Sequence, residues 1–271
     1  MKTSTLRLMC VLAHPDDESL ATGGVLAQCA TEGVATYLLT ATRGERGRYG
    51  DGTSSPGPEV VGRAREAELA AAAAALGVRE VQVLGYPDGA LDQVDHAEAT
   101  ATIAGHLRRV RPHVVVTFGP EGAYGHTDHI AISQLTVAAV ACAADPHYAA
   151  GGNDDPPHRV SKLYFIAWSP EKWAAYQTAL KRLVFCVDGQ ERQATPWPSW
   201  AITTVVDTSR VWPTAWRAVS CHETQMAIYG RLAALPEEHH RALWGTQEFY
   251  RVFSCVNGGR ARETDLLEGL R

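Results

Sequence analysis

The stretch Leu8–Gly33 reads LMCVLAHPDDESLATGGVLAQCATEG and joins an apolar run to a charged turn and a longer segment rich in small residues. Leu8–Leu12 is typical of a buried strand, because it is short, apolar throughout and ends before charged residues. Leu20–Glu32 has a spacing compatible with a helix, and Gly33 is a natural residue to end one. A strand, a polar turn and a helix in this order are the repeating unit of an α/β fold.

The same alternation continues over the first half of the chain. Further strands are predicted at 34–42, 80–86 and 113–120, and helices at 59–78, 95–112 and 126–144. This order predicts a Rossmann-like α/β fold, with a mostly parallel sheet and helices on both of its faces. Ligands of such sheets bind beyond the carboxyl ends of the strands, so the polar turns after the four strands should share one rim.

The rest of the chain predicts loops and a C-terminal α+β elaboration. Residues 43–58 are rich in Gly, Ser and Pro and predict a long loop that can close over a substrate. Beyond it we expect a surface connection at 150–158, strands at 163–168 and 201–207, a helix near 209–229 and an apolar segment at 248–256. We expect a single domain over 1–271, with its core at about 1–145 and the elaboration at about 158–271.

Composition excludes several classes of partner. The net charge is -5 and no basic stripe is present, which argues against binding to nucleic acid or to an anionic membrane surface. No segment is expected to be inserted in a membrane or to act as a signal peptide. The six cysteines include no Cys-x-x-Cys pair and are expected to be reduced core residues of a cytoplasmic protein. A small, neutral or mildly polar ligand fits best, and a homo-oligomer is compatible with the sequence.

Two short motifs could build a metal site. His14 and Asp17 lie three residues apart after the first strand, and His126 and His129 have the same spacing around Asp128. Two histidines and one carboxylate form the ligand set of an open catalytic zinc site, which leaves room for water and substrate. The alternative for each motif is a helix start, in which acidic residues complement the helix dipole without a metal.

Five segments together resemble the LmbE or PIG-L family of zinc-dependent deacetylases. They are AHPDDE followed by TGG, the loop TRGERG, the helix REAELAAAAAALGV, the turn GYPDG and the loop GAYGHTDHI. The family includes enzymes that remove the acetyl group from N-acetylglucosamine on phosphatidylinositol, in mycothiol and bacillithiol synthesis and in antibiotic tailoring. The resemblance covers the first half of the chain and implies the same fold and reaction.

The resemblance implies His14, Asp17 and His129 as metal ligands and Asp16 as the general base. Elementary chemistry agrees, because a carboxylate bound to a cation is less available to accept a proton than its free neighbour. The exchange of roles between the two aspartates is the main alternative. Zn²⁺ is the implied ion, and other divalent metals such as Fe²⁺ stay open.

Further roles are implied for residues around the acetamide. His126 would stabilise the tetrahedral intermediate or protonate the leaving amine, Asp128 would tune its charge, and Tyr124 would polarise the carbonyl. Arg65 and Asp88 would hold sugar hydroxyls. The plainer alternatives are a solvated helix face for Arg65 and a Pro-Asp-Gly turn for Asp88.

Other polar residues have simpler interpretations. Glu18 is expected to be a helix-start residue, and His222 a buried, hydrogen-bonded histidine. The remaining histidines, among them His239 and His240, are expected at the surface.

The function predicted is metal-dependent hydrolysis that removes an acetyl group from an N-acetylated sugar, specifically an N-acetylglucosamine-containing small molecule. The alternatives are an amidase acting on a thiol conjugate and a non-catalytic sugar-binding protein of the same fold. A dinucleotide-dependent oxidoreductase is disfavoured, because no Gly-x-Gly-x-x-Gly follows the first strand and the acidic turn would repel a pyrophosphate.

Overall fold

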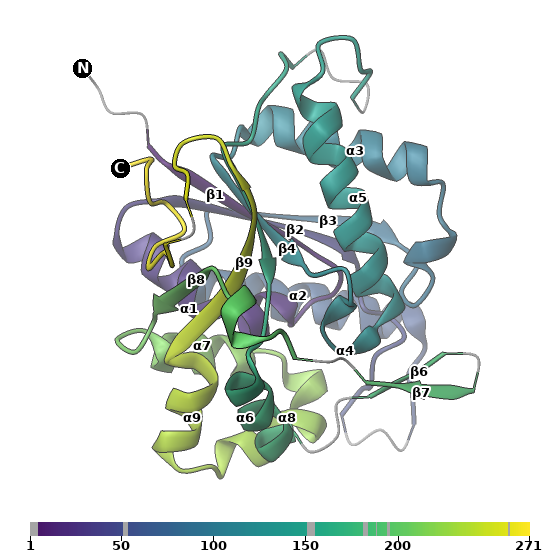
Figure 1. Cartoon of the computed structure of the whole chain (residues 1–271). Coiled ribbons are helices and arrows are strands. Elements are labelled where there is room, and N and C mark those ends of the chain that lie inside the picture. The colour runs from purple at the N-terminus through teal and green to yellow at the C-terminus, as the bar shows by residue number, and fades with distance from the viewer. Residues whose placement is uncertain are drawn as a thin grey trace.

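A computed structural model describes residues 5–50, 54–150, 155–180, 184–187, 189–193, 196–259 and 261–271. Its centre is a seven-stranded sheet in the order β3-β2-β1-β4-β5-β9-β8 (Figure 1). The strands are β1 (Arg7–Leu12), β2 (Ala35–Thr42), β3 (Glu80–Tyr86), β4 (Val114–Phe118), β5 (Lys162–Ile166), β8 (Thr204–Asp207) and β9 (Thr246–Ser254). The first five strands of this order are parallel, and β9 runs antiparallel to both β5 and β8. The predicted mostly parallel α/β fold is confirmed.

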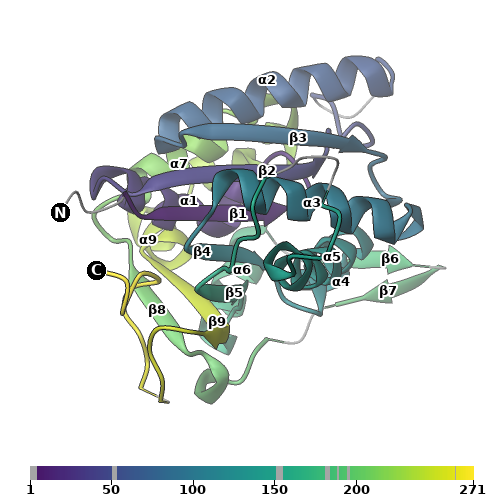
Figure 2. The same cartoon turned by 90° about the horizontal axis from the view of Figure 1, so that it is seen from above.

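Helices cover both faces of the sheet. In Figure 2, α3 and α5 lie in front of the strands, and α1 and α7 lie behind them. The helices are α1 (Asp17–Thr31), α2 (Pro58–Leu76), α3 (His96–Val110), α4 (Gly122–Gly125), α5 (Thr127–Ala144), α6 (Pro170–Leu180), α7 (Trp212–Ser220), α8 (Met226–Ala233) and α9 (Glu237–Trp244). A separate hairpin, β6 (Phe185–Val187) and β7 (Gln190–Arg192), projects beside α4.

Burial explains the apolar opening run. β1 pairs with both β2 and β4 and is sandwiched between helices, so Leu8, Cys10, Val11 and Leu12 are fully buried. A strand covered on both faces needs a continuous apolar sequence and not an alternating one. The end of α1 also agrees with the sequence, because Gly33 follows its last residues with a φ of 77° that suits glycine.

Several expectations are corrected by the structure. The helix expected at 209–229 is two helices, α7 and α8, separated by a 3-10 turn at Glu223–Gln225. His240 is buried rather than exposed, because it stacks among the tryptophans of the α7–α9 layer. All six cysteines are free, yet Cys186 and Cys255 are exposed, so they are not core residues. Parts of two expected loops, 51–53 and 151–154, lie outside the described residues.

One helix is long and apolar enough to span a membrane, judged by its length and composition alone. The 18 residues of α5 are long and apolar enough to span a bilayer, although the sequence pattern predicted no inserted segment. More than half of that helix is buried inside the protein, and it packs against α3 and the sheet. Length and composition alone are therefore weak evidence for membrane insertion, since core helices share them.

Candidate active site

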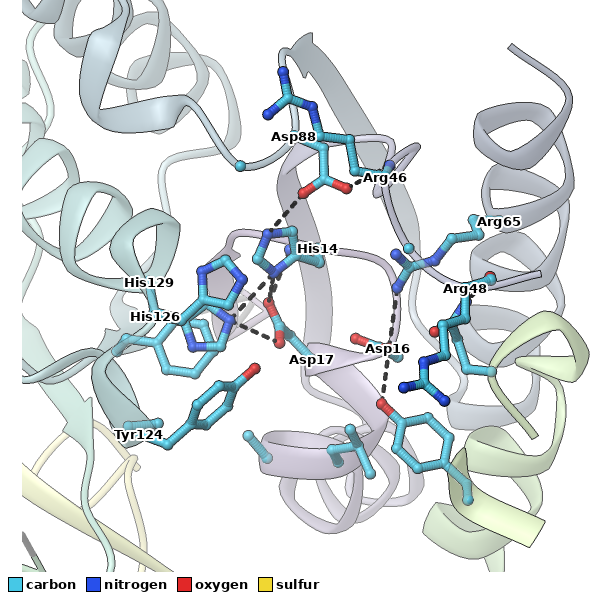
Figure 3. Close-up of a pocket in the computed structure, with 18 of the residues that line it drawn as sticks. His14, Asp16, Asp17, Arg46, Arg48, Arg65, Asp88, Tyr124, His126 and His129 are labelled. Atoms are coloured by element: carbon cyan, nitrogen blue, oxygen red, sulfur yellow. Dashed lines mark hydrogen bonds and ion pairs between the residues drawn. The ribbon is translucent and has the colours of Figure 1, made fainter. Parts of the chain in front are cut away.

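A cavity of about 660 Å³ opens at the predicted rim. It is lined by residues that follow each of the first four strands: His14, Asp16 and Asp17 after β1, Arg46 and Arg48 after β2, Asp88 after β3, and Tyr124, His126 and His129 after β4 (Figure 3). The C-terminal half adds Trp168, Tyr176, Val184, Gln225 and Tyr229. The expectation that the polar turns meet at one rim is confirmed.

The three predicted metal ligands converge. His14 Nδ1 lies 3.2 Å from His129 Nε2, 3.6 Å from Asp17 Oδ2, and the second Asp17 oxygen lies 3.4 Å from His129 Nε2. All three side chains are nearly buried. Two ring nitrogens that face each other beside a carboxylate are a donor set that fits a divalent cation with open positions.

Two further carboxylates contact His14 and orient its ring. Its Nε2 lies 3.0 Å from Asp128 Oδ2 and 3.3 Å from Asp88 Oδ1, so that nitrogen donates outward and Nδ1 is left facing the cavity. Such carboxylate–histidine contacts fix the tautomer and direction of a metal-binding imidazole. The carboxylate of Asp128 also accepts hydrogen bonds from the backbone of Gly89 and Leu91.

Asp128 is expected from the sequence to tune the charge of His126, but in the structure its carboxylate contacts a different histidine, His14. Its carboxylate contacts His14, whereas its backbone N–H is the group that donates to His126 Nδ1, at 3.2 Å. Burial, and then the neighbouring His129 and His14, lower the pKa of His126 to about 3. His126 is thus a neutral imidazole in this surrounding, and Asp128 only partly offsets that effect.

The electrostatics of the cluster favour a positive charge between its carboxylates. Burial opposes charge on His14, but Asp128, Asp17 and Asp88 together raise its pKa well above the ordinary range. Burial likewise opposes charge on Asp17, but His129 and His14 hold the pKa of that carboxyl well below its usual value. A divalent cation bound between these side chains would supply positive charge to the same carboxylates.

Asp16 faces a different environment from its neighbour Asp17 (Figure 3). Its Oδ2 accepts hydrogen bonds from Arg65 Nη2 at 3.0 Å and from the Tyr229 hydroxyl at 2.9 Å. Burial raises the pKa of Asp16, although Arg65 opposes that shift. Arg65 is itself only 4% exposed, so the solvated-face alternative for it is wrong.

Arg65 and Asp88 line the cavity, but protein groups already occupy much of their bonding capacity. Arg65 donates to Gly44 O, Pro15 O and Asp16, and Asp88 accepts from the backbone N–H of Arg46 at 2.8 Å. Burial opposes charge on Asp88, but His14 and that backbone bond lower its pKa to about 2. Contact with sugar hydroxyls stays a prediction for both.

Tyr124 lines the cavity beside the imidazoles, and its role toward the carbonyl stays a prediction. Its ring centroid is 5.5 Å from that of His129 and 6.0 Å from that of His126. Burial raises the pKa of the Tyr124 phenol, so the hydroxyl keeps its proton and can donate a hydrogen bond.

The sequence did not predict the residues by which the C-terminal half lines the cavity. Trp168 and Tyr176 stack with their centroids 4.4 Å apart on one side of the cavity, and Tyr229 reaches Asp16 from α8. These aromatic residues stand in no motif, and their neighbours in sequence are ordinary helix and strand residues. Only the three-dimensional fold brings them to the rim.

Comparison with known proteins assigns the family. Residues 9–140 match the GlcNAc-PI de-N-acetylase (PIG-L) family model. The chain is 36% identical over 306 residues to the 1D-myo-inositol 2-acetamido-2-deoxy-alpha-D-glucopyranoside deacetylase of Kineococcus radiotolerans, covering 97% of this chain and 83% of that protein. The chain therefore belongs to the PIG-L (LmbE-like) family.

Two solved structures share the fold. The N,N'-diacetylchitobiose deacetylase of Pyrococcus horikoshii matches with a TM-score of 0.68 at 18% identity, over 92% of this chain and 84% of that one. The 4-carboxy-2-hydroxymuconate hydratase GalB of Pseudomonas putida KT2440 matches with a TM-score of 0.67 at 19% identity, over 95% and 100%. Because deacetylases and a hydratase share this architecture, the reaction has to be argued from the side chains of the site.

Proposed function

We propose that this chain is a metal-dependent deacetylase that hydrolyses the acetamide of an N-acetylglucosamine-containing small molecule. The observation that carries the proposal is the convergence of His14, Asp17 and His129 beside a separately held Asp16. The Kineococcus relative acts, by its name, on a 2-acetamido-2-deoxyglucopyranoside of myo-inositol, which supports an N-acetylglucosaminyl-inositol as the substrate class.

His14, Asp17 and His129 would hold the ion. Zn²⁺ is proposed because two imidazoles and one carboxylate are a ligand set that open catalytic zinc sites use, although the same donors also suit Fe²⁺. When bound, the ion would polarise a water molecule and the acetamide carbonyl. His126 lies within reach of the same position and is the alternative third nitrogen ligand.

Asp16 would accept a proton from the attacking water. Both of its side-chain contacts use Oδ2, so Oδ1 is the oxygen that would face the water. A carboxyl group whose pKa is raised by burial holds that proton better than an ordinary one and could return it to the leaving amine. Tyr124 and the neutral His126 would donate hydrogen bonds to the developing oxyanion.

Two rival functions make different demands on these residues. A non-catalytic sugar-binding protein has no need of a buried carboxylate beside a complete ligand set. An amidase acting on a thiol conjugate would use the same metal and base, so the site chemistry does not separate it from the deacetylase. A cytoplasmic location is proposed as well, since the six free thiols suit a reducing compartment.

Acetate release by the purified, metal-analysed protein tests the proposal. The substrates are an N-acetylglucosaminyl-inositol, free N-acetylglucosamine and an acetylated thiol conjugate. We expect turnover of the inositol glycoside to exceed that of the other two. No acetate from any substrate by protein with bound metal would refute the deacetylase, and release of an amine without acetate from the thiol conjugate would favour the amidase.

A further inference from the structure

A buried chain of hydrogen bonds connects the C-terminal third to the turn that carries Asp16. Glu18 Oε1 lies 2.8 Å from His222 Nε2 and 2.5 Å from Ser19 Oγ. The other oxygen of Glu18 accepts the backbone N–H of Asp16 at 2.9 Å. Glu18, Ser19 and His222 are all 0% exposed, so solvent cannot replace any of these contacts.

The backbone of Asp16, whose N–H donates to Glu18, is strained. Asp16 has φ 109° and ψ -27°, a left-handed conformation that side-chain-bearing residues rarely adopt. Such a conformation persists only where its surroundings hold it. The carbonyl of Asp16 is held from the first turn of α1, by the N–H groups of Ser19 and Leu20, and its N–H is held by Glu18.

The hydrogen bonds at Glu18 require both oxygens of a carboxylate as acceptors. It receives three hydrogen bonds, from the Asp16 N–H, the Ser19 hydroxyl and His222, spread over both of its oxygens. Through these contacts Glu18 links His222, in the C-terminal third, to the backbone N–H of Asp16.

We propose that Glu18 and His222 are positioning residues that hold the left-handed backbone of Asp16 and thereby aim its carboxylate away from the metal cluster and into the cavity. The inference rests on the proposed function, because it needs Asp16 to act as the base. It also gives a reason for the break between α7 and α8, since His222 is the residue that precedes the 3-10 turn and leaves the helical path.

The test compares His222→Leu with His222→Gln. Leucine removes the donor to Glu18, whereas the glutamine amide can restore it. We expect kcat to fall about 10- to 100-fold in His222→Leu, as misplacement of a reacting group typically causes, and by only a few-fold in His222→Gln. KM and bound metal per chain should stay close to the parent values in both.

Glu18→Gln is the second variant. A glutamine offers one acceptor oxygen, so it must give up either the Asp16 N–H or His222, and we expect a kcat loss of the same size. Glu68→Ala is the matched control. Its carboxylate anchors the same 3-10 turn, through Thr224 N at 2.7 Å and Thr224 Oγ1 at 2.8 Å, and these hydrogen bonds do not involve the Asp16 turn.

Crystal structures of the metal-free variants give a readout that does not depend on turnover. We expect Asp16 to leave its positive φ in His222→Leu and to keep it in Glu68→Ala. An unchanged φ in His222→Leu, or equal kcat losses in His222→Leu and Glu68→Ala, would overturn the positioning role. Failure of the proposed function is distinguished by the parent protein, which would then release no acetate.

Discussion

Removal of one hydroxyl group, in Tyr229→Phe, tests whether Asp16 is the base. The Tyr229 hydroxyl donates to Asp16 Oδ2 at 2.9 Å, and both side chains are largely buried at the wall of the cavity. A hydrogen bond to a charged group contributes about 1.5–3 kcal/mol. Because the bond stabilises the ionised form of Asp16, its loss should shift the protonation equilibrium toward the neutral acid by roughly tenfold or more.

The expected result is displacement of the acid limb of the kcat/KM profile to higher pH. A protonated Asp16 cannot accept a proton from water, so activity falls wherever the neutral form dominates. The assay is acetate release from an N-acetylglucosaminyl-inositol across the pH range, at constant ionic strength and saturating metal. At pH values well above the limb, the variant should approach the parent rate, because Asp16 is then ionised in both.

Tyr176→Phe is the matched control. Tyr176 is a buried tyrosine of the same cavity, and its hydroxyl donates to Leu20 O at 2.8 Å instead of to Asp16. Its variant should leave the acid limb where it is in the parent. If Tyr229→Phe also leaves the limb unmoved, Asp16 does not control it and the assignment of the base is refuted.

Three further outcomes follow from the described contacts. Asp16→Asn should keep the metal and lose about two or more orders of magnitude in kcat, whereas Asp17→Asn should lose metal affinity; elemental analysis with steady-state kinetics checks both, and the reverse pattern would exchange their roles. One divalent ion should bind per chain, and chelation should abolish hydrolysis without a change in far-UV circular dichroism; chelator-resistant activity of metal-free protein would contradict this. Burial opposes charge on Glu263, but its hydrogen bonds, including those from Asn257 and Lys162, lower its pKa from 4.5 to about 2. The ionised Glu263 therefore stabilises the folded state above pH 4.5, and this stability is lost as the pH falls toward 2. The loss of roughly 3 kcal/mol over that window should be visible in urea titrations of the parent and smaller in Glu263→Gln.

The sequence predicts the first half of the fold well, for a physical reason. Strands that are buried on both faces must be apolar throughout, and helices between them must end at residues such as Gly33 and Gly77, so local patterns determine each element. The C-terminal half is less predictable because its helices are short. The continuous pattern of 209–229 hides a break at His222 that depends on a partner more than 200 residues away in sequence.

In the candidate site, too, the residues from the first half of the chain are predictable from the sequence and those from the C-terminal half are not. The polar turns after four parallel strands meet at one rim by topology, so the motif of His14 and Asp17 can be grouped with that of His126 and His129 from the sequence, whereas the choice of His129 as ligand came from the family resemblance. The contacts of Asp16 with Tyr229 and of Glu18 with His222 have no local signal, because one partner of each pair comes from the C-terminal third. Sequence spacing identifies which residues can act, and tertiary contacts determine how each is held.

The adjacent aspartates show why such contacts matter for function. The left-handed backbone at Asp16 separates them: Asp17 faces two histidines that lower its pKa, and Asp16 lies in a buried niche that raises its own although Arg65 opposes this. This difference suits the roles proposed for the two residues, since a ligand must stay ionised and a base must be able to take up and release a proton. If the proposed roles hold, the left-handed backbone of Asp16 and the contacts of Glu18 and His222 that support it matter for catalysis as well as the groups that touch the substrate.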